Sequence, residues 1–248
     1  MFKRFAALGD SLTEGVGDPA WFGLRGWADR LAGEIAAKDP ELEYVNLARR
    51  SLRTAEVIDQ QLGPALEFGA DLAGAVVGMN DLLNPDFKAE RYAADLRRLV
   101  VPLQESGAVV LTASFPDVSR GLPLLSASRR LDLHNRLKSA GDVVRNVSRE
   151  LETVFVDGWE MSARDGINGV MSVDRLHPNA RGHALIAAAF ADQISARTGF
   201  DVEVSEPSGP RLFGLESALH LRWLAVNTIA PAVWRAAKAR LTSSGSHT

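Results

Sequence analysis

The chain has 248 residues with 46% hydrophobic and 24% charged residues and a net charge of −3, a balance that is typical of a soluble globular protein. This balance argues against a disordered chain and against a broadly basic nucleic-acid-binding protein, and the absence of cysteine excludes disulfides, thiol catalysis and thiolate metal sites. The apolar stretch after the charged start covers only residues 5–8, short of the roughly 7 to 15 residues of a secretion signal. No apolar run reaches the roughly 18 residues that a membrane span needs, so we expect a cytoplasmic protein.

Short apolar runs alternate along the chain with longer segments of helical periodicity, a pattern that is typical of a parallel sheet covered by helices on both faces. The predicted strands are residues 5–8, 43–46, 72–77, 108–113 and 153–156. The predicted helices are residues 24–38, 55–68, 89–105, 125–150 and 179–197. Five strands with these connections predict an α/β fold, a three-layer α/β/α doubly wound domain over residues 1–198 with a flavodoxin-like five-stranded parallel sheet.

The composition changes after this domain. Residues 199–210, "GFDVEVSEPSGP", combine turn formers with acids and predict a linker. Residues 211–241 carry five basic residues and one acid, a charge of +4 that leaves −7 for the rest of the chain. Apolar residues recur there at steps of three and four, so residues 211–248 are expected to form an amphipathic basic helical extension and tail, kinked or restarted at Pro231. The extension could pack on the domain or on a second copy, lie on an anionic membrane surface, or cover a site.

The stretch "ALGDSLTEG", residues 7–15, places Ser11 directly after the first predicted strand. Taken alone, an Asp-Ser pair in this position is most often a helix N-cap. A hydrolytic serine requires more: a histidine that takes its proton, a group that orients the histidine, and donors for the oxyanion. A catalytic role for Ser11 therefore depends on groups elsewhere in the chain.

The histidine and its orienting group are found in "SVDRLHPNARGH", residues 172–183. Pro178 holds His177 at a junction between a loop and a helix, because proline favours the start of a helix and extends the residue before it. Asp174, three residues before His177, can reach the imidazole Nδ1 in a tight turn. Nε2 is then free to face a serine hydroxyl.

Two further segments could supply oxyanion donors. In "VVGMND" a buried strand leads to Asn80, whose side-chain amide can donate a hydrogen bond. In "VNLARRSLRT", after the second strand, a backbone N–H near Ser51 could be another donor. If the strands are correct, Ser11, Ser51, Asn80 and the Asp174/His177 pair all follow the carboxyl ends of parallel strands. Open α/β sheets bind ligands at that edge.

"GDSLTEG", "GMND" and "DRLHP", in this order and spacing, resemble the GDSL (also called SGNH) hydrolase family of esterases, lipases and acyl-ester deacylases over roughly residues 5–197. The resemblance implies that Ser11 is the nucleophile, His177 the general base and acid, Asp174 its orienting carboxylate, and Asn80 an oxyanion donor beside the backbone N–H of Ser11. The family usually has glycine where this chain has Ser51. Serine keeps the N–H, but a positive φ at this position would cost about 1 to 3 kcal/mol.

Other features do not change this interpretation. The G-x-S-x-G elbow of the α/β-hydrolase fold is absent, and no histidine pair has zinc-ligand spacing, so we expect neither a metal nor a cofactor. Asp10 and Asp81 are interpreted as structural, and the other four histidines as without a catalytic role. The cluster of Arg49, Arg50 and Arg53 is interpreted as a solvated loop, or as a site that attracts an anionic substrate group.

The predicted function is hydrolysis of small acyl esters through a Ser11–His177–Asp174 triad and an acyl-enzyme. Acyl transfer or thioester hydrolysis on the same fold is the first alternative. A non-catalytic protein that contacts membranes or partners, or associates with itself, through residues 211–241 is the second. The acyl group is left open, although the loops at residues 114–128 and 157–174 are expected to shape the pocket. Their candidate lining residues are Phe115, Leu122, Leu124, Leu125, Trp159 and Met161.

Overall fold

The structure is a computed structural model that describes residues 2–20, 23–122 and 125–204. The predicted extension and the second half of the predicted linker lie outside these residues. The first half of the linker, residues 199–204, packs against the domain: Val202 is buried, and the Phe200 and Phe2 rings meet edge to face at 6.0 Å. Within the described part of the chain, no helix is long and apolar enough to cross a membrane.

Five parallel strands form the central sheet in the order β4-β1-β5-β6-β7, which confirms the predicted fold class. The strands are β1 (Arg4–Gly9), β4 (Glu43–Asn46), β5 (Leu72–Val76), β6 (Val109–Ala113) and β7 (Val154–Val156). The order reverses at β1, because the chain goes first to one side of this strand (β4) and then to the other (β5). A crevice opens at such a switch point, outside the carboxyl ends of the strands.

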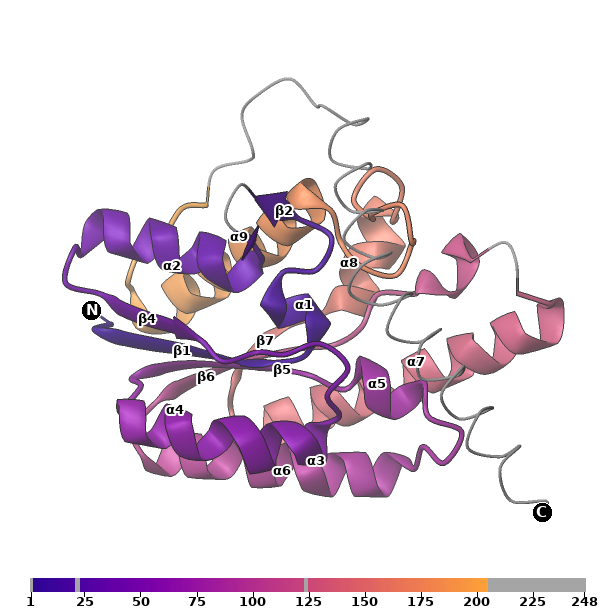
Figure 1. Cartoon of the computed structure of the whole chain (residues 1–248), viewed down its shortest axis with the longest axis horizontal. Helices are drawn as coiled ribbons and strands as arrows, with labels where there is room; N and C mark the ends of the chain where they lie inside the picture. The colour runs from indigo at the N-terminus through magenta and orange to yellow at the C-terminus, as the bar shows by residue number, and fades with distance from the viewer. Residues whose placement is uncertain (1, 21–22, 123–124, 205–248) are drawn as a thin grey trace, which may run out of the picture. The chain divides into compact units, whose positions relative to one another are not determined.

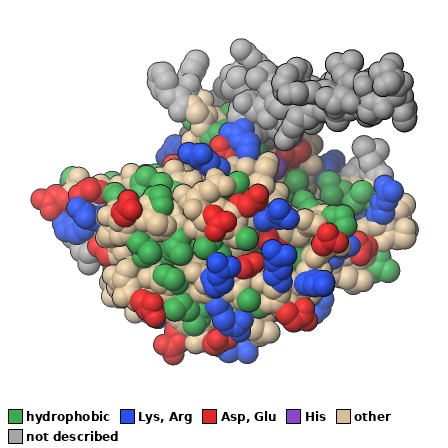
Figure 2. Space-filling model, turned by 60° about the horizontal axis from the view of Figure 1, so that its bottom comes forward, with side chains coloured by type: hydrophobic (Ala, Val, Ile, Leu, Met, Phe, Trp, Pro, Cys, Tyr) green, Lys and Arg blue, Asp and Glu red, His purple; other side chains and the backbone are tan. Residues whose placement is uncertain are grey.

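Helices cover both faces of the sheet (Figure 1). One layer contains α2 (Trp27–Lys38) and α9 (Ala180–Thr198). The other contains α3 (Thr54–Val57), η1 (Ile58–Leu62), α4 (Gly63–Phe68), α6 (Ala89–Glu105) and α7 (Ala127–Glu150). Acidic and basic side chains are interspersed over the outer face of this second layer, which is the pattern of a solvated helix surface (Figure 2).

Side chains of β1 alternate between two apolar cores. Phe5 and Ala7 face the core beneath α2 and α9, whereas Ala6 and Leu8 face the core beneath α6 and α7. All four are fully buried. Burial on both faces explains why β1 is a continuous apolar run in the sequence rather than an alternating one.

The predicted long elements are present with ends shifted by a few residues, but several short elements were not predicted. These are α1 (Ser11–Glu14), the antiparallel pair β2 (Pro19–Ala20) and β3 (Gly23–Leu24), α5 (Met79–Leu82), η2 (Val118–Gly121) and α8 (Gly158–Asp165). The predicted helix at 55–68 contains the π-helical turn η1, in which Gln61 is buried. The Gln61 amide accepts a hydrogen bond from Gly9 N at 2.8 Å and donates one to Gly9 O at 3.0 Å, so this turn fixes the end of β1.

A buried histidine ties α9 to α2 and to the loop after α1. His183 Nδ1 accepts from the backbone N of Trp27 at 3.2 Å, and Nε2 donates to the carbonyl of Val16 at 3.1 Å. This pattern requires a neutral ring. Burial lowers the pKa of His183 to about 3. The prediction that this histidine has no catalytic role agrees with a side chain whose two nitrogens are both used in holding the backbone.

Candidate active site

Ser11 lies at the switch point, where β1 ends and α1 begins. Asp10 is the N-cap of α1, and its Oδ1 accepts from the backbone N of Leu12 at 3.1 Å. The short helix therefore has the cap that an Asp-Ser pair alone predicts. The capping residue is Asp10 and not Ser11. The hydroxyl of Ser11, which is half-buried, remains available for another partner.

That partner is His177. The distance between His177 Nε2 and Ser11 Oγ is 2.9 Å, and the distance between His177 Nδ1 and Asp174 Oδ2 is 2.7 Å. The other carboxylate oxygen, Asp174 Oδ1, accepts from the backbone N of Leu176 at 2.9 Å and of His177 at 3.0 Å, which forms the predicted tight turn. The structure thus brings together the serine, histidine and aspartate from segments more than 160 positions apart.

Two further residues hold the turn and had no signal in the sequence analysis. Ser172 donates its hydroxyl to Asp174 Oδ1 at 2.7 Å, and its backbone N donates to the carbonyl of His177 at 2.8 Å. Asn179, where the predicted helix starts, is the N-cap of α9 and accepts from the backbone N of Arg181 and Gly182. His177 is therefore at the end of a closed turn, two residues before the helix cap.

Ser51 adopts the left-handed backbone conformation that the glycine of the family pattern suggested, with φ of 66°. Its loop is fastened to α1. The carboxylate of Glu14 accepts from the backbone N of Arg50 at 2.8 Å and from the Arg50 guanidinium, and Asn46 Nδ2 donates to the carbonyl of Thr13 at 2.9 Å. These bonds between distant segments can maintain a conformation that a serine disfavours.

Asn80 lies in α5, directly after β5. Its side-chain nitrogen donates to the carbonyl of Leu52 at 3.0 Å and lies 3.4 Å from Asp10 Oδ2. The second contact is long, so one N–H remains weakly engaged at the crevice. The neighbouring Asp81 accepts from the backbone N and the hydroxyl of Thr54 at 2.9 and 3.0 Å, and this agrees with its structural interpretation.

The arginine cluster beside Ser51 is divided between two environments. Arg50 is paired with Glu14, so its guanidinium belongs to the bond network of the loop. Arg49 and Arg53 are exposed, and Arg53 Nε lies 3.6 Å from the carboxylate of Glu56. The solvated interpretation therefore fits Arg49 and Arg53, and the structure shows a positioning contact for Arg50.

The electrostatics of the site are set by a buried carboxyl group. Burial raises the pKa of Asp10 to about 6, against the opposing effects of the Leu12 N–H and of nearby His177. Aspartate in an unfolded chain has a pKa of about 3.9. At pH values between about 4 and 6, Asp10 is therefore protonated in the folded protein and ionised in the unfolded chain. His183 has the opposite effect on the pH dependence of stability. Below pH of about 6.5 the unfolded chain protonates this histidine, whereas the folded protein keeps it neutral.

We expect two opposing pH effects on stability. The contribution of His183 is complete above pH of about 6.5 and is lost as the pH falls, so the excess stability of the wild type over His183→Gln should shrink by about 2 to 3 kcal/mol between pH 8 and pH 4.5.

The contribution of Asp10 is complete below pH of about 4 and is lost as the pH rises through 6. Relative to Asp10→Asn, the wild type should therefore gain about 2 kcal/mol over the same fall in pH. Urea unfolding of the three proteins at several pH values measures both; parallel curves would contradict the two assignments.

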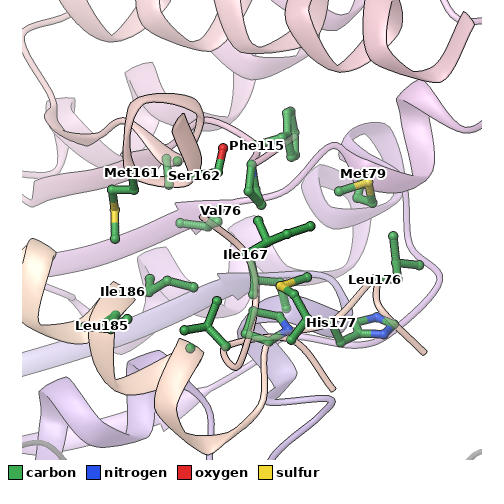
Figure 3. A pocket seen from close by; sticks show the side chains of 18 of the residues that line it. Val76, Met79, Phe115, Met161, Ser162, Ile167, Leu176, His177, Leu185 and Ile186 are labelled. Carbon is green, nitrogen blue, oxygen red and sulfur yellow. The ribbon is translucent and has the colours of Figure 1, made fainter. Parts of the chain in front are cut away.

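A cavity of about 170 Å³ opens beside Ser11 and His177 at the carboxyl edge of β5, β6 and β7. Of the candidate lining residues, Phe115 and Met161 line it. Trp159 lines an adjoining hollow with His134 and Asp117, and this hollow shares Ser162 and Ile167 with the first cavity. Leu122 and Leu125 pack against the core beneath α6 and α7. Leu124 lies outside the described residues. Figure 3 shows the apolar side chains that surround the cavity.

Among the residues that the structure describes, no three His, Asp or Glu side chains gather as a metal site would require. His134 instead pairs with Asp117, with 3.0 Å between Nδ1 and Oδ2, and its ring meets the ring of Trp159 edge to face. His220 and His247 lie outside the described residues. The polar groups described at the switch point are a hydroxyl, an imidazole, carboxylates, an amide and backbone N–H groups.

Comparisons with known proteins indicate a family and support the fold. The sequence profile of the GDSL-like Lipase/Acylhydrolase family matches residues 7–185. The acetylxylan esterase of Geobacillus stearothermophilus is 23% identical over 215 residues, which cover 77% of this chain and 94% of the esterase. A crystal structure of that esterase has a TM-score of 0.62 at 20% identity, covering 77% of this chain and 94% of its own. The lipase/acylhydrolase of Enterococcus faecalis has a TM-score of 0.64 at 19% identity, covering 83% of this chain and all of its own.

Proposed function

The chain belongs to the GDSL-like lipase/acylhydrolase (SGNH) family, and we propose that it hydrolyses carboxylic esters through a Ser11–His177–Asp174 triad and an acyl-enzyme on Ser11. The observation that carries the proposal is the continuous path of two hydrogen bonds, 2.9 Å from Ser11 Oγ to His177 Nε2 and 2.7 Å from His177 Nδ1 to Asp174. A serine becomes a nucleophile when a correctly oriented imidazole can take its proton.

In the first half of the reaction, Ser11 Oγ attacks the ester carbonyl carbon while His177 Nε2 accepts the hydroxyl proton. Asp174 holds Nδ1–H and stabilises the imidazolium that forms. When the tetrahedral intermediate collapses, His177 returns the proton to the alcohol, which leaves. In the second half, His177 takes a proton from water, water attacks the acyl carbon, and Ser11 recovers its proton as the carboxylic acid is released.

We assign the stabilisation of the oxyanion to three donors. Ser11 N is at the start of α1, where a backbone N–H has no partner within its own helix. The other two are the backbone N–H of Ser51, in the loop after β4, and the weakly engaged side-chain N–H of Asn80, in α5 after β5. Donors placed before the reaction stabilise developing charge without reorganisation, and this is commonly the largest single contribution to catalysis.

The related acetylxylan esterase supports these assignments. Solved variants of it that replace one serine, one aspartate or one histidine by alanine are called catalytic mutants, and its aspartate and histidine are three positions apart. Asp174 and His177 have the same separation. Membership of a family of enzymes also favours catalysis over a purely partner-binding role.

A fluorophosphonate probe tests the proposal directly, because it reacts covalently with an activated serine. We expect the wild type to gain one probe, located by peptide mass spectrometry on the peptide that contains Ser11. The Ser11→Ala variant should not react, whereas Ser106→Ala, a substitution at the end of α6, should react as the wild type does. A wild-type protein that stays unlabelled at Ser11 would rule out the activated serine.

A further inference from the structure

The cavity beside Ser11 extends away from the reacting groups. Figure 3 shows His177, Leu176 and Met79 on one side of the cavity and Met161, Leu185 and Ile186 on the opposite side. Val76, at the end of β5, lies between the two groups. The cavity thus has an end at the proposed catalytic groups and a far end formed by α8 and α9.

The lining of the cavity is mostly apolar, and its polar groups largely have partners within the protein. The Ser114 hydroxyl donates to Asp157 at 2.8 Å, and the Ser162 hydroxyl donates to the carbonyl of Trp159 at 2.8 Å. Arg181 is the exception: it brings a cation to the lining, and its buried Nε has no hydrogen-bond partner among the described residues. Such a lining favours a hydrocarbon chain over a sugar, which would need hydrogen-bonding groups.

Close backbone approaches fix the walls. A Cβ atom on Gly182 of α9 would lie 2.2 Å from the carbonyl oxygen of Val170, and one on Gly158 of α8 would lie 2.5 Å from that of Ser114. Any other residue at these positions would push the helices outward. Because α8 and α9 are held this tightly, the cavity is a preformed space rather than a gap that closes when empty.

The volume sets the length of the chain that fits. An apolar cavity of roughly 150 Å³ accommodates benzene, a molecule of six carbons. The cavity of about 170 Å³ beside Ser11 has comparable room, whereas an acetyl group would place one methyl group in it. An acetyl group would leave the space lined by Met161, Leu185 and Ile186 unfilled.

We propose that this cavity is the acyl-binding chamber, and that the protein prefers acyl chains of about six to eight carbons over acetyl. The inference rests on the proposed function. The acyl group remains on Ser11 after the alcohol has left, so an apolar chamber is suited to hold it while water enters from the rim. Each buried methylene should raise kcat/KM about fourfold until the chamber is full.

A series of p-nitrophenyl esters from acetate to dodecanoate tests the inference. With the wild type, kcat/KM should be highest for hexanoate or octanoate and at least about tenfold higher for hexanoate than for acetate. Ile186→Phe should fill the far end and lower the hexanoate-to-acetate ratio at least about tenfold. Ile186→Ala should move the optimum to longer chains, and it serves as the second variant if the phenylalanine impairs folding. The matched control is Ala196→Phe on the exposed side of α9, which should keep the wild-type ratio.

Two results would overturn the chamber while leaving the ester hydrolase intact. The first is a preference for acetate in activity that depends on Ser11. The second is an unchanged hexanoate-to-acetate ratio and an unchanged optimum in both folded Ile186 variants. A protein that hydrolyses no ester of the series in a Ser11-dependent manner would instead contradict the proposed function.

Discussion

Replacement of Ser11 by alanine should lower kcat for p-nitrophenyl hexanoate by about 10³-fold or more, because it removes the hydroxyl that is hydrogen-bonded to His177 Nε2. The substitution should slow the chemical step without destabilising the fold. Ser11 is the first residue of α1, and alanine is a good helix former, so we expect the free energy of unfolding to change by less than about 1 kcal/mol. Steady-state hydrolysis and urea unfolding of the same preparations measure the two quantities.

The matched control is Ser106→Ala, a serine-to-alanine change whose lost hydroxyl bond is to the carbonyl of Leu103, at the end of α6. It should retain wild-type kcat. If Ser11→Ala kept more than a tenth of the wild-type activity, Ser11 would not be the nucleophile. Equal losses in both variants would indicate a general loss of folded protein, which the unfolding curves would reveal.

Replacement of Asn80 by alanine should lower kcat by about 10²- to 10³-fold with little change in KM, as expected for a donor that stabilises the oxyanion more than the bound ester. The same amide donates to Leu52 O, so part of the effect could come from a displaced loop. Crystal structures or thermal unfolding of the variant separate the two causes. An effect below threefold would place the oxyanion donor elsewhere.

Ser51→Ala is the control for this experiment. The proposed contribution of Ser51 is its backbone N–H, which alanine retains, and its side chain is exposed. The variant should therefore keep kcat within about threefold of the wild type, whereas Asn80→Ala loses a side-chain donor of the kind worth about 3 to 4 kcal/mol elsewhere. A large loss in Ser51→Ala would show that the hydroxyl itself takes part.

Most of the central sheet could be predicted from the sequence because β1, β5 and β6 are buried on both faces. A run such as β1, with Phe5 to Leu8 fully buried, is continuous in apolar residues and ends at a glycine. The site residues were recognisable for a related reason: Ser11, Ser51 and Asn80 follow strands within five residues, and Asp174 and His177 lie in a turn that ends at a proline. Their convergence then follows from parallel topology alone.

Short helices and long-range contacts could not be predicted in this way. The four residues of α1 and of α5 are too few to show a helical period. Gln61 fixes Gly9 across 52 positions, and Glu14 fixes Arg50 across 36, so nothing near either residue indicates its partner. The chamber could not be predicted for the same reason. Its far wall combines α8 with α9, and neither segment alone forms a cavity.

Ser51, which is exposed and has a left-handed backbone conformation, is also a suitable position for a fluorescent label. The chain contains no cysteine, so Ser51→Cys would introduce a single thiol that a maleimide dye can label at the rim of the crevice. A cysteine is close to serine in size, and the bonds from Glu14 to Arg50 hold the loop independently of this side chain. Fluorescence from that dye could then follow substrate entry and product departure in real time, without a chromogenic leaving group.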